Sequence, residues 1–296
     1  MRRPAEDMPG SMTRRNLLRS TAAAAAAGVI SPARAAQGPK GTAVTNGRLR
    51  QSACRWCYGR IPIDDLAAAA KRMGLVGIDL LRPGEEFEAV KRHGLVCTMT
   101  STHSLTKGLN DPANHDECLG AILEGIEATA KEGWRNVITF SGNRNGMDDR
   151  TGLEHCAKAL REIVPEAEKA GVVIHMELLN SKVDHPDYMC DRSDWGVELV
   201  NRVGSDHFRL LYDIYHMQIM EGDIIRTIER HHTAFGHYHT GGNPGRHELD
   251  DSQELYYPAI CRAIVDTGFD GVLAQEFIPT RDPLTSLSEA VALCDV

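Results

Sequence analysis

The sequence predicts a single α/β domain that folds as a (β/α)8 barrel, the TIM-barrel architecture, preceded by an export signal. The prediction rests on eight short β-type runs, on segments with helical apolar spacing between most of them, and on glycines where the chain turns back into a strand. Such a barrel needs eight strand–helix units and commonly takes about 250 residues. The expected strands are 49–54, 76–80, 95–100, 136–140, 172–178, 208–214, 234–240 and 271–277.

The segments between the strands have the apolar period of amphipathic helices. The expected helices are 63–73, 118–132, 153–170, 195–203, 224–231 and 258–267. Glycines stand where a left-handed cap would lead into the next strand, at Gly74, Gly94, Gly133, Gly171 and Gly268. The alternative is a doubly wound open sheet, which often has a glycine-rich phosphate loop after its first strand. Residues 53–58, Ala-Cys-Arg-Trp-Cys-Tyr, form no such loop, so the barrel is favoured.

The first 36 residues predict a twin-arginine signal peptide. Arg14 and Arg15 precede an apolar tract, 21–30, and a small-residue cleavage site follows at 33–35. The alternatives are a flexible alanine-rich tail and an amphipathic transit peptide. The tract is too short to remain in the membrane as a permanent span, so it is interpreted as a signal and not as an anchor. We therefore expect a protein exported to the periplasm or another extracytoplasmic space. A linker at 37–47 and a catalytic barrel at 48–296 would follow.

Composition restricts the class of partner. Of the 296 residues, 42% are hydrophobic and 25% are charged, as is typical of a soluble globular protein. The formal net charge of -8 argues against nucleic acid as the main partner, because phosphate backbones are bound by basic surfaces. A small-molecule partner is expected, and the oligomeric state is left open.

Eight cysteines in an exported protein raise the question of disulfides. Most of them stand singly in apolar segments and are interpreted as buried small residues. Cys54 and Cys57 form the one close pair, which would suit a redox couple or half of a zinc site. No second pair of this spacing follows, so packed thiols are the favoured interpretation and a disulfide between these two cysteines is left open.

Polar residues stand at the ends of four consecutive predicted strands. Glu177, Asp213, His239 and Glu276 would meet at one rim, because parallel strands end on the same side of a barrel. Three carboxylates in a dry barrel mouth repel one another unless a cation neutralises them. The sequence therefore predicts one divalent metal ion, with Mn²⁺ or Mg²⁺ favoured and Co²⁺ or Zn²⁺ as alternatives. Any one of these residues alone would more often be a helix cap or an ion-pair partner.

His237 and the loop after His239 extend this cluster. Alternate residues of a strand face the same side, so His237 would lie one step deeper than His239, either orienting a ligand or packed as a core histidine. Residues 241–245, Gly-Gly-Asn-Pro-Gly, would turn the backbone so that Arg246 returns over the site. A guanidinium there could hold a substrate carboxylate or hydroxyl pair, the alternative being a surface ion pair.

Longer motifs surround these positions. They are 176–180 (Met-Glu-Leu-Leu-Asn), 212–218 (Tyr-Asp-Ile-Tyr-His-Met-Gln), 236–239 (Gly-His-Tyr-His) with 244–248 (Pro-Gly-Arg-His-Glu), 254–258 (Glu-Leu-Tyr-Tyr-Pro) and 275–279 (Gln-Glu-Phe-Ile-Pro). In their order and spacing the chain resembles, from about residue 49 to 281, the xylose-isomerase-like TIM barrels, and among them the hydroxypyruvate isomerases.

The resemblance implies a role for each matching residue. Glu177, Asp213, His239 and Glu276 match metal ligands, and the two glutamates also match the pair that moves a proton between adjacent substrate carbons. His216 matches a histidine that hydrogen-bonds a substrate oxygen, and Arg246 matches an arginine that contacts the substrate. One position departs from the pattern. Hydroxypyruvate isomerases usually carry glutamine where His239 stands, whereas the related ketose 3-epimerases carry histidine.

The resemblance implies an isomerase that depends on a divalent metal and acts on a small hydroxy-keto acid or sugar through an enediolate. A ketose 3-epimerase and a keto-polyol dehydratase or lyase are alternatives on the same residues. An endonuclease of the endonuclease-IV type shares the scaffold but needs more histidine ligands and a basic surface. The non-enzymatic alternative is an exported sugar-binding barrel.

Overall fold

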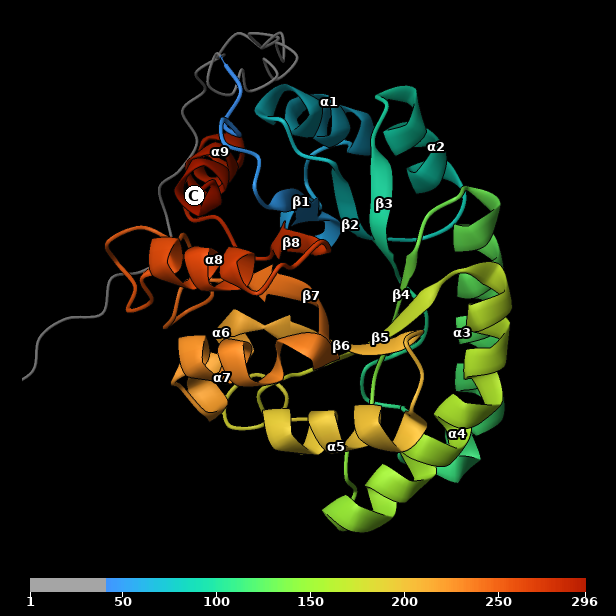
Figure 1. Ribbon diagram of the computed structural model, residues 1–296. Helices are drawn as coiled ribbons and strands as arrows, with labels where there is room; N and C mark the ends of the chain where they lie inside the picture. Colours follow the sequence, from blue (N-terminus) through green and yellow to red (C-terminus); the bar gives the residue numbers. More distant parts are fainter. Residues whose placement is uncertain (1–40) are drawn as a thin grey trace, which may run out of the picture. The chain divides into compact units, whose positions relative to one another are not determined.

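Eight parallel strands close into a barrel in the order of the sequence, which confirms the predicted (β/α)8 barrel. The computed structural model describes residues 41–296, so the predicted signal peptide lies outside the described residues. Ala53 pairs with Ile78 on one side and with Gln275 on the other, which closes the ring between the first and last strands (Figure 1). The strands are β1 Arg50–Cys54, β2 Gly77–Leu81, β3 Val96–Thr100, β4 Asn136–Thr139, β5 Val173–Glu177, β6 Phe208–Asp213, β7 Phe235–Thr240 and β8 Val272–Gln275.

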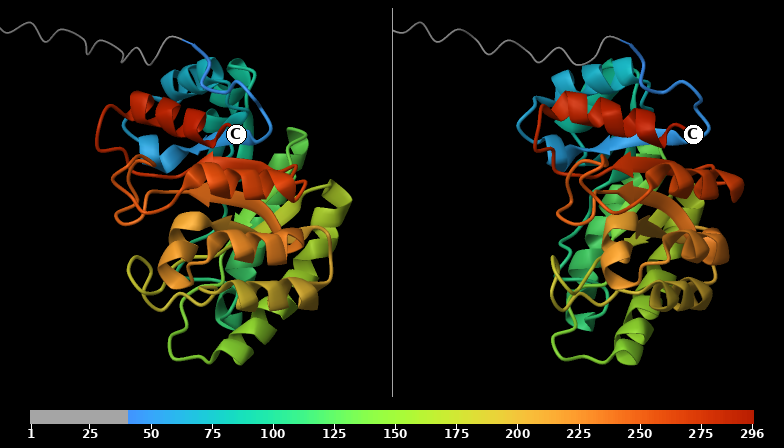
Figure 2. Two further views of the ribbon diagram at one scale, coloured as in Figure 1. Left: turned by 60° about the vertical axis from the view of Figure 1, so that its left-hand side comes forward. Right: turned by 90° about the vertical axis from the view of Figure 1, so that its left-hand side faces the viewer.

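Helices surround the strands, and α9 lies beside α1 where the barrel closes (Figure 2). The α-helices are α1 Ile63–Met73, α2 Glu85–Arg92, α3 His115–Lys131, α4 Asp149–Ala170, α5 Ser193–Val203, α6 Ile214–Met220, α7 Ile224–His231, α8 Tyr257–Asp266 and α9 Pro283–Cys294. Short 3-10 turns occur at η1 Arg55–Tyr58, η2 Pro112–Asn114 and η3 His232–Ala234. Each of the six predicted helices is present, and α1 has the predicted bounds.

Three helices, α2, α6 and α9, were not among those predicted. In α6 five of the seven residues are buried, so the segment has no polar face to give an amphipathic period. The α2 helix is short and mostly charged, with acidic residues in its first turn and Lys91 and Arg92 in its last turn, an order that suits the helix dipole.

The predicted glycine caps all have left-handed backbone, with φ of 90° at Gly74, 66° at Gly94, 70° at Gly133, 69° at Gly171 and 78° at Gly268. At Gly74 a side chain is also excluded by space, because a Cβ would lie 2.8 Å from Thr42 Oγ1. Part of the predicted linker packs against the barrel here: the Ala43 and Val44 N–H groups donate to the Met73 carbonyl at 3.0 Å each.

The main core fills the layer between the strands and the helices. Buried apolar residues of β4 to β8 pack there against α3 to α8, and a second cluster joins β1 to β3 with α1, α2 and α9. The lumen of the barrel is different, because it holds buried polar side chains such as Asp79, His175 and His237. Within residues 41–296, every helix is too short or too polar to cross a membrane.

Candidate metal centre

The structure brings all four predicted ligands together. Each offers one ligand atom, and the four atoms lie within 4.8 Å of one another. Glu177 and Asp213 are the last residues of β5 and β6, His239 is the penultimate residue of β7, and Glu276 follows β8. The strand register explains the meeting, since Asp213 is paired with His239, and His239 with Ala274 two residues before Glu276.

The electrostatics of this cluster suit a divalent cation. Burial raises the pKa of Glu177 and of Asp213, whereas the charges of Arg246 and His239 outweigh burial and hold the pKa of Glu276 well below its usual range. Glu177 Oε1 has no hydrogen-bond donor among residues 41–296, although His239 Nδ1 lies 3.2 Å away. Three buried carboxylates, one of them with an oxygen left without a donor, and an imidazole form a donor set that fits Mg²⁺, Mn²⁺ or a similar ion.

Asp79 on β2 supports His239 from behind. His239 Nδ1 lies 2.9 Å from Glu276 Oε2, while its Nε2 lies 2.9 Å from Asp79 Oδ2. The Thr98 hydroxyl donates to the other oxygen of Asp79. A carboxylate that accepts the N–H of one ring nitrogen fixes the orientation and the tautomer of the ring, so that the other nitrogen, Nδ1, faces the remaining members of the ligand cluster.

The protonation tendencies of Asp79 and His239 agree with this contact. Burial alone would raise the pKa of Asp79, but His237 and His239 hold it well below its usual value. Burial alone would lower the pKa of His239, but Glu276 and the other anionic neighbours raise it above its usual value. Asp79 was not among the predicted site residues, because its only signal in the sequence is a single carboxylate inside the apolar run 76–80.

His237 is fully buried one step deeper on β7, as its position in the strand predicts. Its Nε2 lies 3.2 Å from Asp79 Oδ1, and its ring centroid is 5.4 Å from that of His239. His237 therefore stands behind the ligand cluster and beside the carboxylate that holds His239. Both interpretations left open by the sequence, an orienting group and a packed histidine, are compatible with this place.

Arg246 returns over the cluster, as the loop sequence suggested. Its guanidinium contacts Glu276 Oε2 and lies 3.3 Å from Asp213 Oδ2, so the arginine pairs with two predicted ligands. The guanidinium carbon also lies 5.0 Å from the Trp56 ring centroid and 5.3 Å from that of Tyr215. With 12% of its side chain exposed, Arg246 is not in a surface ion pair.

His216 lies on the first turn of α6, next to Asp213. Its backbone N–H donates to Asp213 Oδ1 at 3.0 Å, so Asp213 also caps the helix. Asn180 Nδ2 lies 2.6 Å from His216 Nδ1, and among the described residues the buried Nε2 has no hydrogen-bond partner. This nitrogen lies 3.6 Å from Asp213 Oδ2, and Asn180 fixes the ring through the opposite nitrogen.

Cys54, the last residue of β1, and Trp56, in the 3-10 turn η1 that follows it, also reach the ligand cluster. Trp56 Nε1 donates to Glu276 Oε1 at 2.6 Å, while 44% of the residue stays exposed at the mouth. Cys54 and Cys57 are free thiols. Cys54 Sγ lies 3.8 Å from His239 Nε2, and burial raises the pKa of this thiol. Trp56 was not among the predicted site residues, because a single aromatic residue between two cysteines gives no sequence signal for this contact.

Comparison with known proteins places the fold and the motifs in one family. The model of the xylose isomerase-like TIM barrel family matches residues 63–294. The chain belongs to this family. Among curated relatives of this xylose isomerase-like barrel, 2-oxo-tetronate isomerase of Cupriavidus necator is 29% identical over 232 residues, which are 73% of this chain and 86% of that protein. A putative hydroxypyruvate isomerase of Homo sapiens is 29% identical over 233 residues, covering 79% of this chain and 80% of that protein.

Solved structures share the fold of the xylose isomerase-like barrel. The crystal structure of an AP endonuclease, family 2, from Brucella melitensis superposes with a TM-score of 0.72 and 22% identity, covering 81% of this chain and 97% of the other. At this identity the likeness concerns the fold. The resemblance to hydroxypyruvate isomerases predicted from the motifs is thus supported by the family match and by the names of the curated relatives.

Proposed function

We propose that this protein is a divalent-metal-dependent isomerase of a small hydroxy-keto acid or sugar. The observation that carries the proposal is the buried four-residue cluster in which carboxylate oxygens of Glu177 and Glu276 lie 3.2 and 2.9 Å from His239 Nδ1, together with Asp213. The names of the two curated relatives, 2-oxo-tetronate isomerase and hydroxypyruvate isomerase, support the same substrate class.

Glu177, Asp213, His239 and Glu276 would hold the metal. When bound, a divalent cation supplies stabilisation of the negative charge that develops on the substrate oxygens. One glutamate removes the proton from the carbon next to the carbonyl, and the other returns a proton to the neighbouring carbon. The hydroxyl proton of the first carbon is transferred to the oxygen of the second, so that aldehyde and ketone exchange places without an external oxidant.

The other residues of the mouth orient the substrate. His216 offers its free Nε2 to a substrate oxygen, while Asn180 fixes the opposite ring nitrogen. Arg246 would hold a substrate carboxylate or hydroxyl pair through its fork of donors. Trp56, donating to Glu276 Oε1, fixes the orientation of that carboxylate and covers one side of the site.

A second candidate function is ketose 3-epimerisation, in which the proton returns to the opposite face of the same carbon. The observation that favours it is His239, because the resemblance leads one to expect glutamine at this position in hydroxypyruvate isomerases. A dehydratase or lyase uses the same enediolate to expel a neighbouring hydroxyl. An exported sugar-binding barrel would use the cluster without proton transfer.

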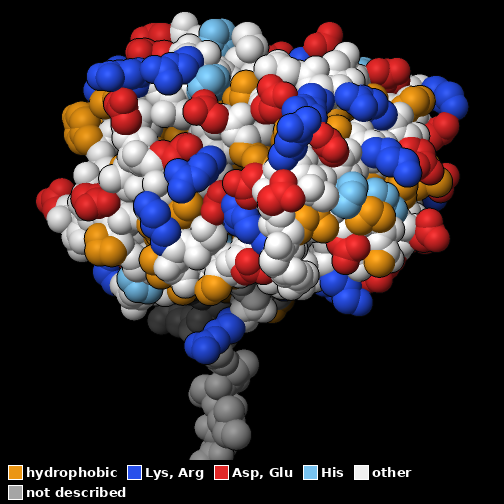
Figure 3. Space-filling view, turned by 90° about the horizontal axis from the view of Figure 1, so that it is seen from below, with side chains coloured by type: hydrophobic (Ala, Val, Ile, Leu, Met, Phe, Trp, Pro, Cys, Tyr) orange, Lys and Arg blue, Asp and Glu red, His pale blue; other side chains and the backbone are white. Residues whose placement is uncertain are grey.

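We also propose that residues 1–36 direct export by the twin-arginine route to an extracytoplasmic compartment, and that the partner is a small molecule. The face in Figure 3 intersperses acidic and basic side chains. On that face the described residues form no continuous basic track of the kind that binds a phosphate backbone.

The deciding experiment follows deuterium from solvent into substrate carbon. The protein, loaded with Mg²⁺ or Mn²⁺, is incubated in D2O with hydroxypyruvate, 2-oxo-tetronate or a ketose, and the small molecules are separated and identified by NMR. We expect metal-dependent carbon-bound deuterium in one substrate, and the product distinguishes isomerase from epimerase or lyase. An EDTA-treated sample and Glu276→Gln should be silent, whereas Glu162→Gln, an exposed glutamate on α4, should react normally. Silence of the loaded wild-type protein across the panel would refute the proposal.

A further inference from the structure

A cavity opens at the opposite end of the barrel from the ligand cluster. Its volume is about 720 Å³, and its wall contains the first residues of six strands: Arg50, Val96, Asn136, Val173, Phe235 and Val272. It therefore lies at the N-terminal end of the lumen, whereas the ligands lie at the C-terminal end. Its volume is within the range of about 300–1,000 Å³ that small-molecule sites occupy.

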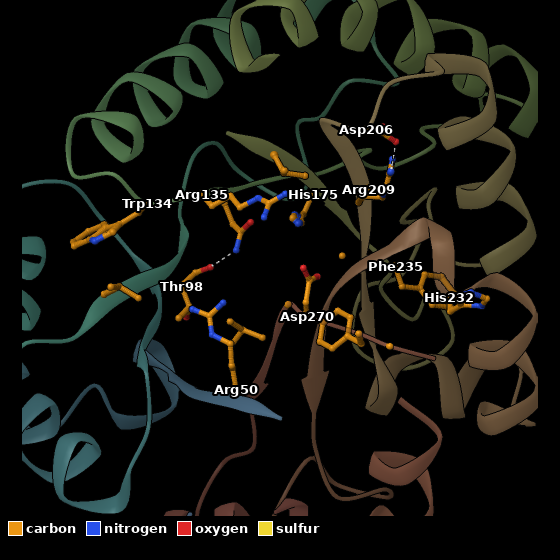
Figure 4. A pocket seen from close by; sticks show the side chains of 18 of the residues that line it. Arg50, Thr98, Trp134, Arg135, His175, Asp206, Arg209, His232, Phe235 and Asp270 are labelled. Atoms are coloured by element: carbon orange, nitrogen blue, oxygen red, sulfur yellow. Dashed lines mark hydrogen bonds and ion pairs between the residues drawn. The ribbon is translucent and has the colours of Figure 1, made fainter. Parts of the chain in front are cut away.

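Arginines dominate the charge of this cavity. Arg50, Arg135 and Arg209 line it, and Figure 4 shows Arg50 and Arg135 facing the same open space as Asp270. Arg209 is already paired with Asp206, at 2.5 Å. Arg50 and Arg135 are both exposed to solvent, and neither makes an ion pair or a side-chain hydrogen bond with any residue of 41–296. Two guanidinium groups without an acceptor thus face one carboxylate, in a protein whose formal net charge is -8.

His175 forms the inner wall of the cavity. It is 1% exposed, lines the cavity and has no hydrogen-bond partner on either ring nitrogen among the described residues. Buried polar atoms in folded proteins are almost always partnered by protein, water or a ligand. Gly236 keeps the space open, because a Cβ there would lie 2.9 Å from His175 Nε2 and 3.0 Å from Arg209 Cβ.

We propose that this cavity is a second binding site, for a small hydroxylated anion that carries a carboxylate or a phosphate. Arg50 and Arg135 bind the anionic group through charge-assisted hydrogen bonds. Asp270 accepts hydrogen bonds from the hydroxyl groups, and His175 donates one from its protonated ring nitrogen. The site is separate from the proposed metal centre, since a ligand here enters from the other end of the barrel, and it does not depend on the proposed isomerase activity.

Isothermal titration of the metal-loaded protein tests this site with two probes, glycerol 3-phosphate for the phosphate and D-glycerate for the carboxylate. We expect one molecule of at least one probe to bind, and the probe that binds more tightly identifies the anionic group. In Arg50→Gln/Arg135→Gln the Kd should rise by about tenfold or more. The matched control, Arg72→Gln/Arg262→Gln, removes two exposed arginines that lie outside the cavity and should keep the wild-type Kd.

Separate variants distinguish this site from the metal centre. Binding that survives in Glu276→Gln but weakens in the cavity variant supports the proposal. Binding lost in Glu276→Gln and kept in the cavity variant would assign the probe to the metal centre and overturn the proposal, as would an absence of binding up to about 10 mM of either probe. If the double variant is poorly folded by circular dichroism, Arg135→Gln alone decides, and an unchanged Kd refutes the site.

Discussion

Asp79→Asn tests whether the carboxylate behind His239 determines metal affinity. The substitution keeps the side-chain shape in a fully buried position but removes its charge. It weakens the acceptor 2.9 Å from His239 Nε2, and the amide must also satisfy Thr98 and the nearby His237 Nε2 at 3.2 Å. The ring of His239 is then free to adopt the other tautomer, in which a proton on Nδ1 faces Glu177 and Glu276.

The expected magnitude follows from the bond that changes. A hydrogen bond to a charged group contributes about 1.5–3 kcal/mol and a neutral one about 0.5–1.5 kcal/mol. The free energy that holds the His239 ring in its ligand orientation therefore falls by about 1–2 kcal/mol. Loss of such a supporting carboxylate typically costs about 10–100-fold in metal affinity. We therefore expect the Kd for Mn²⁺ to rise by about one order of magnitude or more while the barrel stays folded.

Competition with a fluorescent chelator measures this Kd without any assumption about activity. Asp64→Asn is the matched control, because its carboxylate is 48% exposed, pairs with Arg92 and does not belong to the ligand cluster. Its Kd for Mn²⁺ should equal that of the wild type. An Asp79→Asn protein that is folded by circular dichroism and binds Mn²⁺ within about twofold of the wild type would refute the reasoning.

Three further predictions concern catalysis, substrate handling and stability. Glu276→Gln should remain folded but lose turnover, and retention of more than about a tenth of the wild-type rate would contradict the proposed proton transfer. His216→Ala should raise KM while the bound metal, measured by elemental analysis, stays close to the wild-type content. A loss of metal as large as that caused by Glu276→Gln would make His216 a ligand. Glu248, 4% exposed, accepts hydrogen bonds from Thr280 and Ser286 that outweigh burial and lower its pKa from 4.5 to about 2. Because the folded pKa is the lower one, its contribution of up to about 3 kcal/mol is present above about pH 4.5 and is lost as the pH falls toward 2. Urea unfolding should therefore separate wild type from Glu248→Gln at neutral pH and less at about pH 3, and an equal difference at both would count against this reasoning.

Much of the fold is predictable because the signals are local. A strand of four to six residues between turn residues, and a helix with one apolar stripe, are defined by neighbours in the sequence, as for β5 and α1. The α6 helix lacked this signal because it is buried on most sides. Where a glycine must adopt positive φ, as at Gly74, the requirement is local too.

The ligand cluster was predictable for a different reason. Once parallel strands are ordered around a barrel, the residues at their C-terminal ends must converge, so Glu177, Asp213, His239 and Glu276 could be grouped without coordinates. The motifs around them also carried the family resemblance, which the family match bears out.

The sequence by itself therefore determined the barrel, its order of elements and the rim where the chemistry would occur. Tertiary structure alone decided which side chains meet across the lumen. Asp79 and His239 are 160 residues apart, and Trp56 and Glu276 are 220 apart, yet each pair is hydrogen-bonded. Such contacts depend on strand tilt, register and side-chain direction together, and no local pattern encodes that combination. The same holds for the cavity at the other end, where residues from six strands meet around Arg50, Arg135 and His175.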